Sequence, residues 1–199
     1  MCTVRQVRAR FDDRTITVYQ AYSPSIAEPA LAAGRFVPPF KPDRMTWIKP
    51  SFLWMMYRSG WATKPGQERV LAITITREGF EWALSQAALS SYNSRFHNSR
   101  EAWRSHLKAA PTRVQWDPER DLDLRELPYR SLQLGLGPQA VPRYVSEWTT
   151  SMSDATPLAR EIRALLTAGE REKAAALLPQ ETPYPLPAEI AAVRPTHSP

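Results

Sequence analysis

The stretch RMTWIKPSFLWMMYRSGW, residues 44–61, is the densest run of aromatic, apolar and basic side chains in the chain. Pro50 cannot continue a helix from upstream, but a proline suits the first turn of a new helix. We therefore expect an extended piece at 45–49 and a helix from about 51 to 58, which Gly60 ends. The side chains of this stretch expected in the core are Leu53, Trp54 and Met56.

Segments on both sides of this stretch alternate between apolar and polar residues, as strands do. The run VLAITIT at 70–76 is the clearest strand, with every second apolar side chain on one face. The run RSLQLGL at 130–136 places its leucines inward and Gln133 outward. The four strands that this pattern predicts are residues 14–21, 70–76, 112–116 and 130–136.

Helical spacing and capping residues predict the remaining elements. Ser23 or Ser25 caps a short helix that ends at Gly34, and Thr76 caps a longer helix. Because a proline follows Asp117, we expect a turn at 117–121. The other expected helices are residues 77–89, a short one around Trp103, 139–152, 156–169 and a last one ending at Leu178. Strands and helices mix without strict alternation, which indicates an α+β fold rather than a doubly wound sheet.

Composition limits the class of protein. The chain has 199 residues and is 43% hydrophobic, enough to bury a core. It shows neither a long apolar run nor a secretory signal, and Cys2 is its one cysteine, so we expect a cytoplasmic protein that does not enter membranes. A net charge of +6, mostly from arginine, favours anionic partners such as nucleotides or nucleic acid. A genome that prefers arginine codons would give the same excess.

Known motifs are absent from the sequence or incomplete in it. The run GLGPQA at 135–140 matches a dinucleotide fingerprint, but two prolines crowd the expected helix start, so a turn is the better interpretation. The acidic run at 117–123 has calcium-loop spacing but lacks the central glycine. There is no phosphate-binding P-loop, and the three histidines have no cysteine or paired-histidine company. We therefore expect no metal.

Three groups of residues could form a site. The first lies in the dense central stretch, where cations bind phosphate and aromatic rings stack on bases. The second is Glu119 with Gln115, because a carboxylate just past a strand can act as a base. The third lies at the end of the first strand, where ligand contacts are common. The candidates are Tyr19, Gln20, Tyr22, Arg44, Trp47, Lys49, Ser51, Tyr57 and Glu119. The alternative is that the rings pack in the core and the charges are solvated.

Several long runs resemble domain-of-unknown-function family 4291, over about residues 4–155. The runs that carry this resemblance are RQVRA (5–9), VYQAYSPSIAEPAL (18–31), RMTWIKPSFLWMMYRSGW (44–61), QWDPER (115–120) and YRSLQLGL (129–136). The family name itself implies no activity.

A remoter resemblance is to the ADP-ribosyltransferases that modify DNA or RNA. Tyr19 and Gln20 resemble the first-strand motif of that family, although Gln20 stands where histidine or arginine is usual. Residues 40–54 look like its second block, with Pro50 before Ser51 rather than after it. Glu119 would take the place of the catalytic glutamate, here next to a proline.

This resemblance implies a split-sheet core with flanking helices and a cleft that binds NAD as the substrate. Gln20 and Glu119 would be catalytic, and Glu119 would stabilise the positive charge that develops as nicotinamide leaves. Arg44 and Lys49 would hold the pyrophosphate. The other residues implied to bind NAD are Tyr19, Tyr22, Trp47, Ser51 and Tyr57.

The organisation expected from these observations has three parts. Residues 1–155 form the ligand-binding and catalytic α+β domain, residues 156–178 form helices packed on it, and residues 179–199 form a proline-rich extended tail. The leading hypothesis is an ADP-ribosyltransferase-like enzyme that uses NAD to modify a nucleic acid or nucleotide. The alternatives are a non-catalytic nucleic-acid-binding module and another nucleotide- or RNA-processing enzyme.

Overall fold

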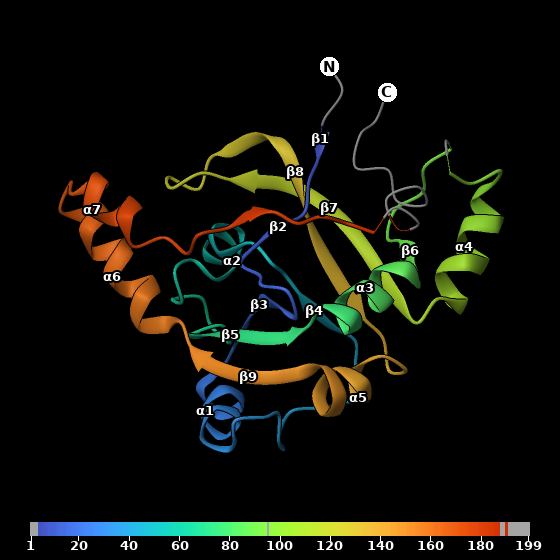
Figure 1. The fold of residues 1–199 in the computed structure, drawn as a ribbon, viewed down its shortest axis with the longest axis horizontal. Coiled ribbons are helices and arrows are strands. Elements are labelled where there is room, and N and C mark those ends of the chain that lie inside the picture. Colours follow the sequence, from blue (N-terminus) through green and yellow to red (C-terminus); the bar gives the residue numbers. More distant parts are fainter. Residues whose placement is uncertain (1–3, 95, 188–189, 191–199) are drawn as a thin grey trace.

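Residues 4–94, 96–187 and 190, which the computed structural model describes, contain two main β-sheets joined by helices and a short β-ribbon (Figure 1). The larger sheet has the order β1-β8-β7-β6, with β4 paired to β8, and the smaller sheet has the order β3-β5-β9. The strands of the larger sheet are β1 Val4–Arg5, β4 Thr46–Ile48, β6 Ala87–Leu89, β7 Thr112–Arg120 and β8 Glu126–Leu136. Those of the smaller sheet are β3 Thr15–Tyr22, β5 Arg69–Thr76 and β9 Thr149–Asp154, and the ribbon pairs β2 Arg8–Ala9 with β10 Thr182–Pro183. The predicted α+β class is confirmed.

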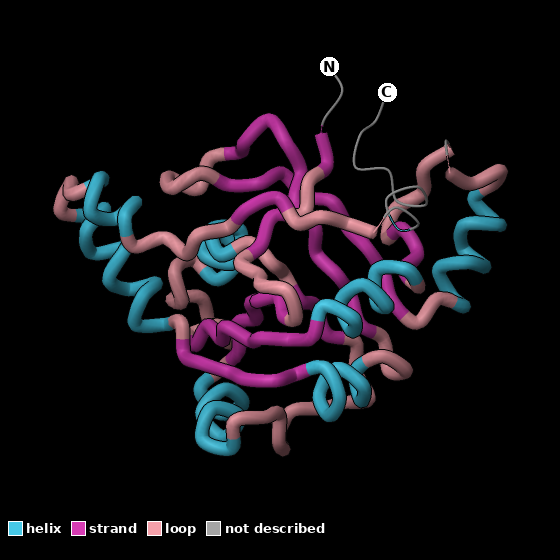
Figure 2. Tube along the Cα trace, in the orientation of Figure 1, coloured by secondary structure: helices cyan, strands magenta, loops and turns pink. Residues whose placement is uncertain are grey.

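Helices flank both sheets and extend beyond them at two ends. Figure 2 shows α6 and α7 at one end of the molecule and α4 at the other, with α1 and α5 beside the smaller sheet. The helices are α1 Pro24–Ala33, α2 Phe52–Ser59, α3 Arg77–Ser85, α4 Arg100–Ala109, α5 Val141–Arg143, α6 Thr156–Thr167 and α7 Arg171–Ala176, and a π-turn, η1 Tyr144–Trp148, follows α5. Within the described residues, none of these helices is long and apolar enough to cross a bilayer.

The junction between β4 and α2 forms as the sequence predicts. Ser51 caps α2, and its hydroxyl accepts a hydrogen bond of 3.2 Å from the Trp54 amide. The helix ends at Gly60, whose φ of 60° lies in the left-handed region that glycine adopts most easily. Trp54 and Met56 are buried as expected, whereas Leu53 is half-buried.

The core consists of two apolar clusters. The larger lies against one face of the larger sheet and includes Leu132, Leu134 and Leu136, the inward residues predicted for that strand. The smaller cluster surrounds α2 and α6 and includes Phe52, Met56 and Ile162.

The helix predicted at 77–89 is wrong in its last part. Helix α3 ends at Ser85, and residues 87–89 form β6, which pairs in parallel with β7. The small side chains of this segment fit helix and strand alike. Pairing with a strand distant in sequence therefore decides its structure.

The turn predicted at 117–121 is also wrong. Strand β7 continues through Pro118 to Arg120, with a register shift against β8 beside the proline. Pro118 lies beyond residues 112–114, the part of β7 that pairs with β6, so this part of β7 is an edge. A proline is tolerated at an edge or a bulge.

The helix predicted at 139–152 is correct only over residues 141–148. The chain turns after Trp148 into β9, which pairs with the free edge of β5. Tyr144 and Trp148 are buried, so the apolar pattern was correct for its first half. The second half follows a backbone partner that lies far away in the sequence.

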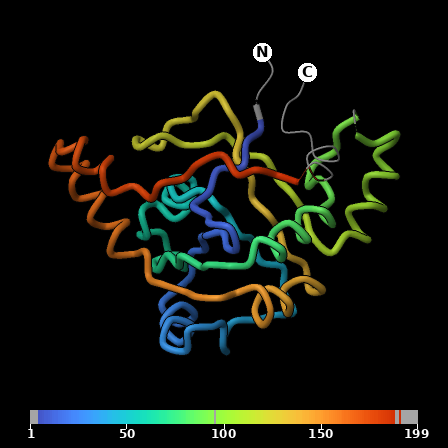
Figure 3. Tube along the Cα trace, in the orientation of Figure 1, coloured from blue at the N-terminus to red at the C-terminus, as the bar shows by residue number. Residues whose placement is uncertain are grey.

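Part of the proline-rich C-terminal segment packs along the N-terminal strand β2. Figure 3 shows the red C-terminal segment beside the blue N-terminal segment, where β10 pairs with β2. Glu181 and Tyr184 of this segment contact the body of the protein. Of the predicted tail, residues 188–189 and 191–199 lie outside the described residues.

Candidate functional site

The two sheets meet at one point and separate beyond it. Tyr19 of β3 and Lys49, just after β4, form an isolated antiparallel bridge with N–O distances of 2.7 and 3.2 Å. Beyond this bridge, side chains rather than backbone hydrogen bonds connect β3 to β4. The result is a split between the sheets, with β3 on one side and β4 on the other.

Gln20 holds the split at a fixed width. Its amide nitrogen donates to the Thr46 hydroxyl at 2.7 Å and to the Trp47 carbonyl at 3.0 Å. Its amide oxygen accepts from the Tyr144 hydroxyl at 2.8 Å, and the residue is 3% exposed. Both amide hydrogens are thus engaged within the protein. Tyr22 adds a second link through its hydroxyl, 2.9 Å from that of Thr46.

Replacing Gln20 by methionine, which has a similar shape, is expected to cost about 1–3 kcal/mol of unfolding free energy. The change leaves the buried Tyr144 hydroxyl and Trp47 carbonyl without their partner. Urea denaturation measures the cost, and Gln139→Met, at an exposed position, is the matched control. Equal stability of the two variants would show that Gln20 does not hold the split.

A pocket of about 630 Å³ fills the split. Ligand pockets commonly have volumes of about 300–1,000 Å³. Residues of β3, β4, α2 and the loop at 65–67 line it, together with one glutamine each from β7 and β8. Its lining residues are Gln20, Ala21, Tyr22, Met45, Thr46, Trp47, Ile48, Lys49, Trp54, Met55, Arg58, Pro65, Gly66, Gln67, Gln115 and Gln133.

The polar floor of the pocket follows from strand alternation. On β8, Leu132 and Leu134 face the apolar core, so Gln133 between them faces the pocket. Gln115 is its direct partner on β7, and Asp117 lies two residues further along the same face. Trp47 of β4 packs on Gly135, where a Cβ atom would approach the indole ring to 3.0 Å. A flat aromatic ring thus adjoins a row of amides and a carboxylate.

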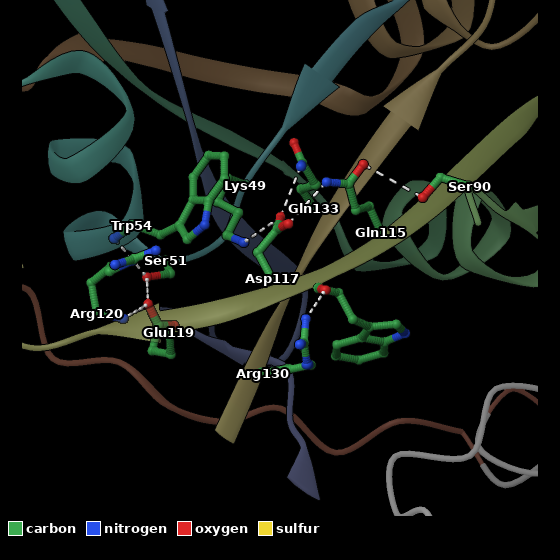
Figure 4. Close-up of polar contacts among 11 residues, drawn as sticks. Lys49, Ser51, Trp54, Ser90, Gln115, Asp117, Glu119, Arg120, Arg130 and Gln133 are labelled. Carbon is green, nitrogen blue, oxygen red and sulfur yellow. Dashed lines mark hydrogen bonds and ion pairs between the residues drawn. The ribbon is translucent and has the colours of Figure 1, made fainter. Parts of the chain in front are cut away.

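Lys49 is a buried amine between an indole ring and a carboxylate. Its side chain is 1% exposed, and Nζ lies 3.9 Å from the centroid of the Trp54 ring and 3.7 Å from Asp117 Oδ2 (Figure 4). Among the described residues, Nζ has no partner within hydrogen-bond distance. Burial lowers the pKa of Lys49 to about 7, although Asp117 and Glu119 act in the opposite direction.

Two glutamine amides hold the carboxylate of Asp117. Gln115 Nε2 donates to Oδ1 at 2.9 Å, and Gln133 Nε2 donates to Oδ2 at 2.8 Å. Figure 4 shows both glutamines and Lys49 pointing toward this one side chain. Asp117 lies directly behind the two glutamines that line the pocket.

Glu119 lies on the same strand but is bound to a different part of the protein. Its Oε1 accepts from the Ser51 hydroxyl at 2.8 Å and from the Arg120 amide at 2.9 Å, and the residue is 4% exposed. Nearby, Glu181 accepts from the Phe52 amide at 2.7 Å. Burial raises the pKa of Glu181 to about 8. Two carboxylates from distant parts of the chain thus meet the first turn of α2.

The structure brings together some of the predicted site residues and separates others. Gln20, Tyr22, Trp47 and Lys49 line the pocket. The other candidates are not among the described residues that line it: Ser51 and Glu119 are bonded to each other beneath α2, Tyr19 packs on Phe52, Arg44 is exposed in the preceding loop, and Tyr57 is exposed against Arg120. In the described part of the chain, no cluster of three or more His, Cys, Asp or Glu could hold a metal ion.

Four residues near the site were not among its predicted members: Trp54, Asp117, Gln133 and Glu181. The alternating pattern of 130–136 already placed Gln133 on the outward face, so a signal for it existed. Asp117 was hidden by the proline that follows it, which favours a turn. Glu181 has no local signal, because its partner Phe52 is 129 residues away in the sequence.

Comparison with known proteins gives a family but no activity. A family model described as "Domain of unknown function (DUF4291)" matches residues 6–184. No curated protein matches the chain.

Proposed function

The chain belongs to the DUF4291 family, whose description states no activity, and we propose from its pocket that it is an ADP-ribosyltransferase-like enzyme that uses NAD. The observation that carries the proposal is the pocket itself, of about 630 Å³, at the split between the two sheets. A cleft between two small sheets is what the resemblance to ADP-ribosyltransferases implies. The proposal includes a split-sheet core of that kind, with a nucleic acid or a nucleotide as the acceptor.

The lining of the pocket suits the parts of a dinucleotide. Trp47 and Tyr22 offer aromatic faces on which a nicotinamide or adenine ring can stack. Gln115 and Gln133 offer amide groups for polar edges. Arg58 is exposed at the edge of the pocket, where its guanidinium can meet a phosphate.

The chemistry that such a pocket would perform is transfer at a sugar carbon. The bond from C1′ of the ribose to nicotinamide breaks, and nicotinamide leaves with the bonding electrons. Positive charge develops on C1′, and a fixed carboxylate stabilises it in a site that excludes water. The acceptor then forms the new bond to C1′ and loses a proton. Strand β7 offers two carboxylates for this role, Asp117 and Glu119.

The test is to mix the purified protein with NAD and follow free nicotinamide, with and without added DNA or RNA. The proposal expects release of nicotinamide, and a rise in the melting temperature with NAD. Gly135→Phe, which drives a ring into the space of Trp47, is expected to abolish both effects. Absence of release and of a thermal shift in the unchanged protein would refute the proposal.

The non-catalytic nucleic-acid-binding module is the outcome if NAD has no effect but polynucleotide binds. The net charge of +6 favours this alternative. Binding to a polynucleotide would weaken steeply as salt rises, because phosphate contacts release counterions. Binding of NAD would weaken only mildly.

A further inference from the structure

We infer that Asp117, rather than Glu119, is the carboxylate that meets the ligand, and that it accepts hydrogen bonds from the hydroxyl groups of a ribonucleoside. The inference rests on the pocket proposed above as the nucleotide site, but not on the transfer reaction. It concerns two carboxylates of one strand that have different surroundings.

The accessibility of the two side chains separates their roles. The side chain of Asp117 is 19% exposed, whereas Glu119 is 4% exposed as a residue. Both glutamines that hold Asp117 line the pocket, and so does its ion-pair partner Lys49. The partners of Glu119 are the Ser51 hydroxyl and a backbone amide, which belong to the capping of α2 and to its own strand. Glu119 therefore fixes the helix, and Asp117 faces the ligand.

The hydrogen-bonding state of Asp117 leaves room for a ligand. Each carboxylate oxygen accepts one amide hydrogen, from Gln115 on Oδ1 and from Gln133 on Oδ2. A carboxylate oxygen can accept two hydrogen bonds, so accepting capacity remains on both atoms. Lys49 Nζ, at 3.7 Å, compensates the charge of Asp117 from within the protein without occupying that capacity. The group is thus a charged, oriented acceptor.

The class of ligand follows from what such an acceptor requires. A carboxylate accepts from hydroxyl or N–H donors and repels phosphate. Lys49 cannot offset this repulsion at the surface of the pocket, because its own side chain is only 1% exposed. Two neighbouring acceptor oxygens suit the two adjacent hydroxyl groups of a ribose. The ring of the nucleoside then lies against Trp47 or Tyr22, and its phosphate extends toward Arg58.

The experiment compares adenosine with 2′,3′-dideoxyadenosine, which lacks both hydroxyls, for binding to the unchanged protein, Asp117→Asn and Glu119→Gln. The unchanged protein is expected to bind adenosine about 10- to 100-fold more tightly, as a hydrogen bond to a charged group predicts. Asp117→Asn is expected to bind the two nucleosides equally. Glu119→Gln is expected to keep the preference while its melting temperature falls.

Other outcomes decide against the inference. Equal binding of the two nucleosides by the unchanged protein, or binding of neither, overturns it. So does loss of the preference in Glu119→Gln with retention in Asp117→Asn. If Asp117→Asn does not fold, Gln133→Leu removes one of the amides that orient the carboxylate and is expected to weaken the preference. A preference for adenosine without any nicotinamide release would refute the transferase but leave this inference standing.

Discussion

Replacing Tyr184 by alanine is expected to lower the unfolding free energy by about 3–5 kcal/mol, as for other large aromatic side chains removed from a core. The ring is 5% exposed and packs edge-on against Phe11 and Phe80, with centroid distances of 5.0 and 5.5 Å. Its hydroxyl donates to Glu81 and accepts from Arg77 Nε at 2.8 Å. This side chain therefore fastens the C-terminal segment to α3 and to the N-terminal segment.

Two further variants separate the contributions of the ring and the hydroxyl. Tyr184→Phe keeps the ring and is expected to cost about 1 kcal/mol, the usual net value of a hydrogen bond. Tyr57→Ala, at a position that is 41% exposed, is the control and is expected to cost little. Guanidinium denaturation measures all three. If Tyr184→Ala is no less stable than Tyr57→Ala, the C-terminal segment does not contribute to the fold.

The unfolding free energy is expected to pass through a minimum between about pH 7 and pH 8, because two buried groups titrate there in opposite senses. Burial lowers the pKa of Lys49 to about 7, against an ordinary value of 10.5. The stability that this group contributes is present above the ordinary value and is lost as the pH falls toward 7. The charged groups that act on it are Asp117, Glu119 and Arg120.

Glu181 produces the other side of the minimum. Burial, with Glu119 nearby, raises its pKa to about 8, against an ordinary value of 4.5. The stability that it contributes is present below the ordinary value and is lost as the pH rises toward 8. The slope on each side is about 1.4 kcal/mol per pH unit for each group.

Denaturation curves between about pH 5 and pH 10 test this expectation. Lys49→Met should remove the rise in stability on the alkaline side, and Glu181→Gln should remove the rise on the acidic side. The two variants serve as controls for each other, since each should leave the opposite side unchanged. A maximum near neutral pH in the unchanged protein would contradict the account of both groups.

The parts of the fold that the sequence predicted are those with local signals. The β4–α2 junction was predicted because Pro50, the Ser51 cap and Gly60 all act within a few residues. Strands β6 and β9 were missed because their structure depends on β7 and β5, which lie far away in the sequence. Small or polar side chains in these segments carry no strong preference of their own.

The candidate site divides in the same way. Tyr22, Trp47 and Lys49 were predicted because they flank a strand end and a helix start, where ligands often bind. Asp117 was not predicted, because its position depends on a strand that continues through Pro118. Arg44 and Tyr57 have the right chemistry for a ligand site, but the backbone places both on the surface and outside the lining of the pocket. Composition identified the segment, and only the pairing of strands identified the side chains that meet.

Hydrogen exchange with and without NAD tests most directly whether the split between the sheets is the ligand site. The account predicts slower exchange on adding NAD at three places: residues 45–49, the loop at 65–67 and the central part of β7 around Gln115. Helix α4, at the far end of the molecule, serves as the internal control and should not change (Figure 1). Unchanged exchange at the pocket with saturating NAD, or protection confined to another surface, would contradict the account.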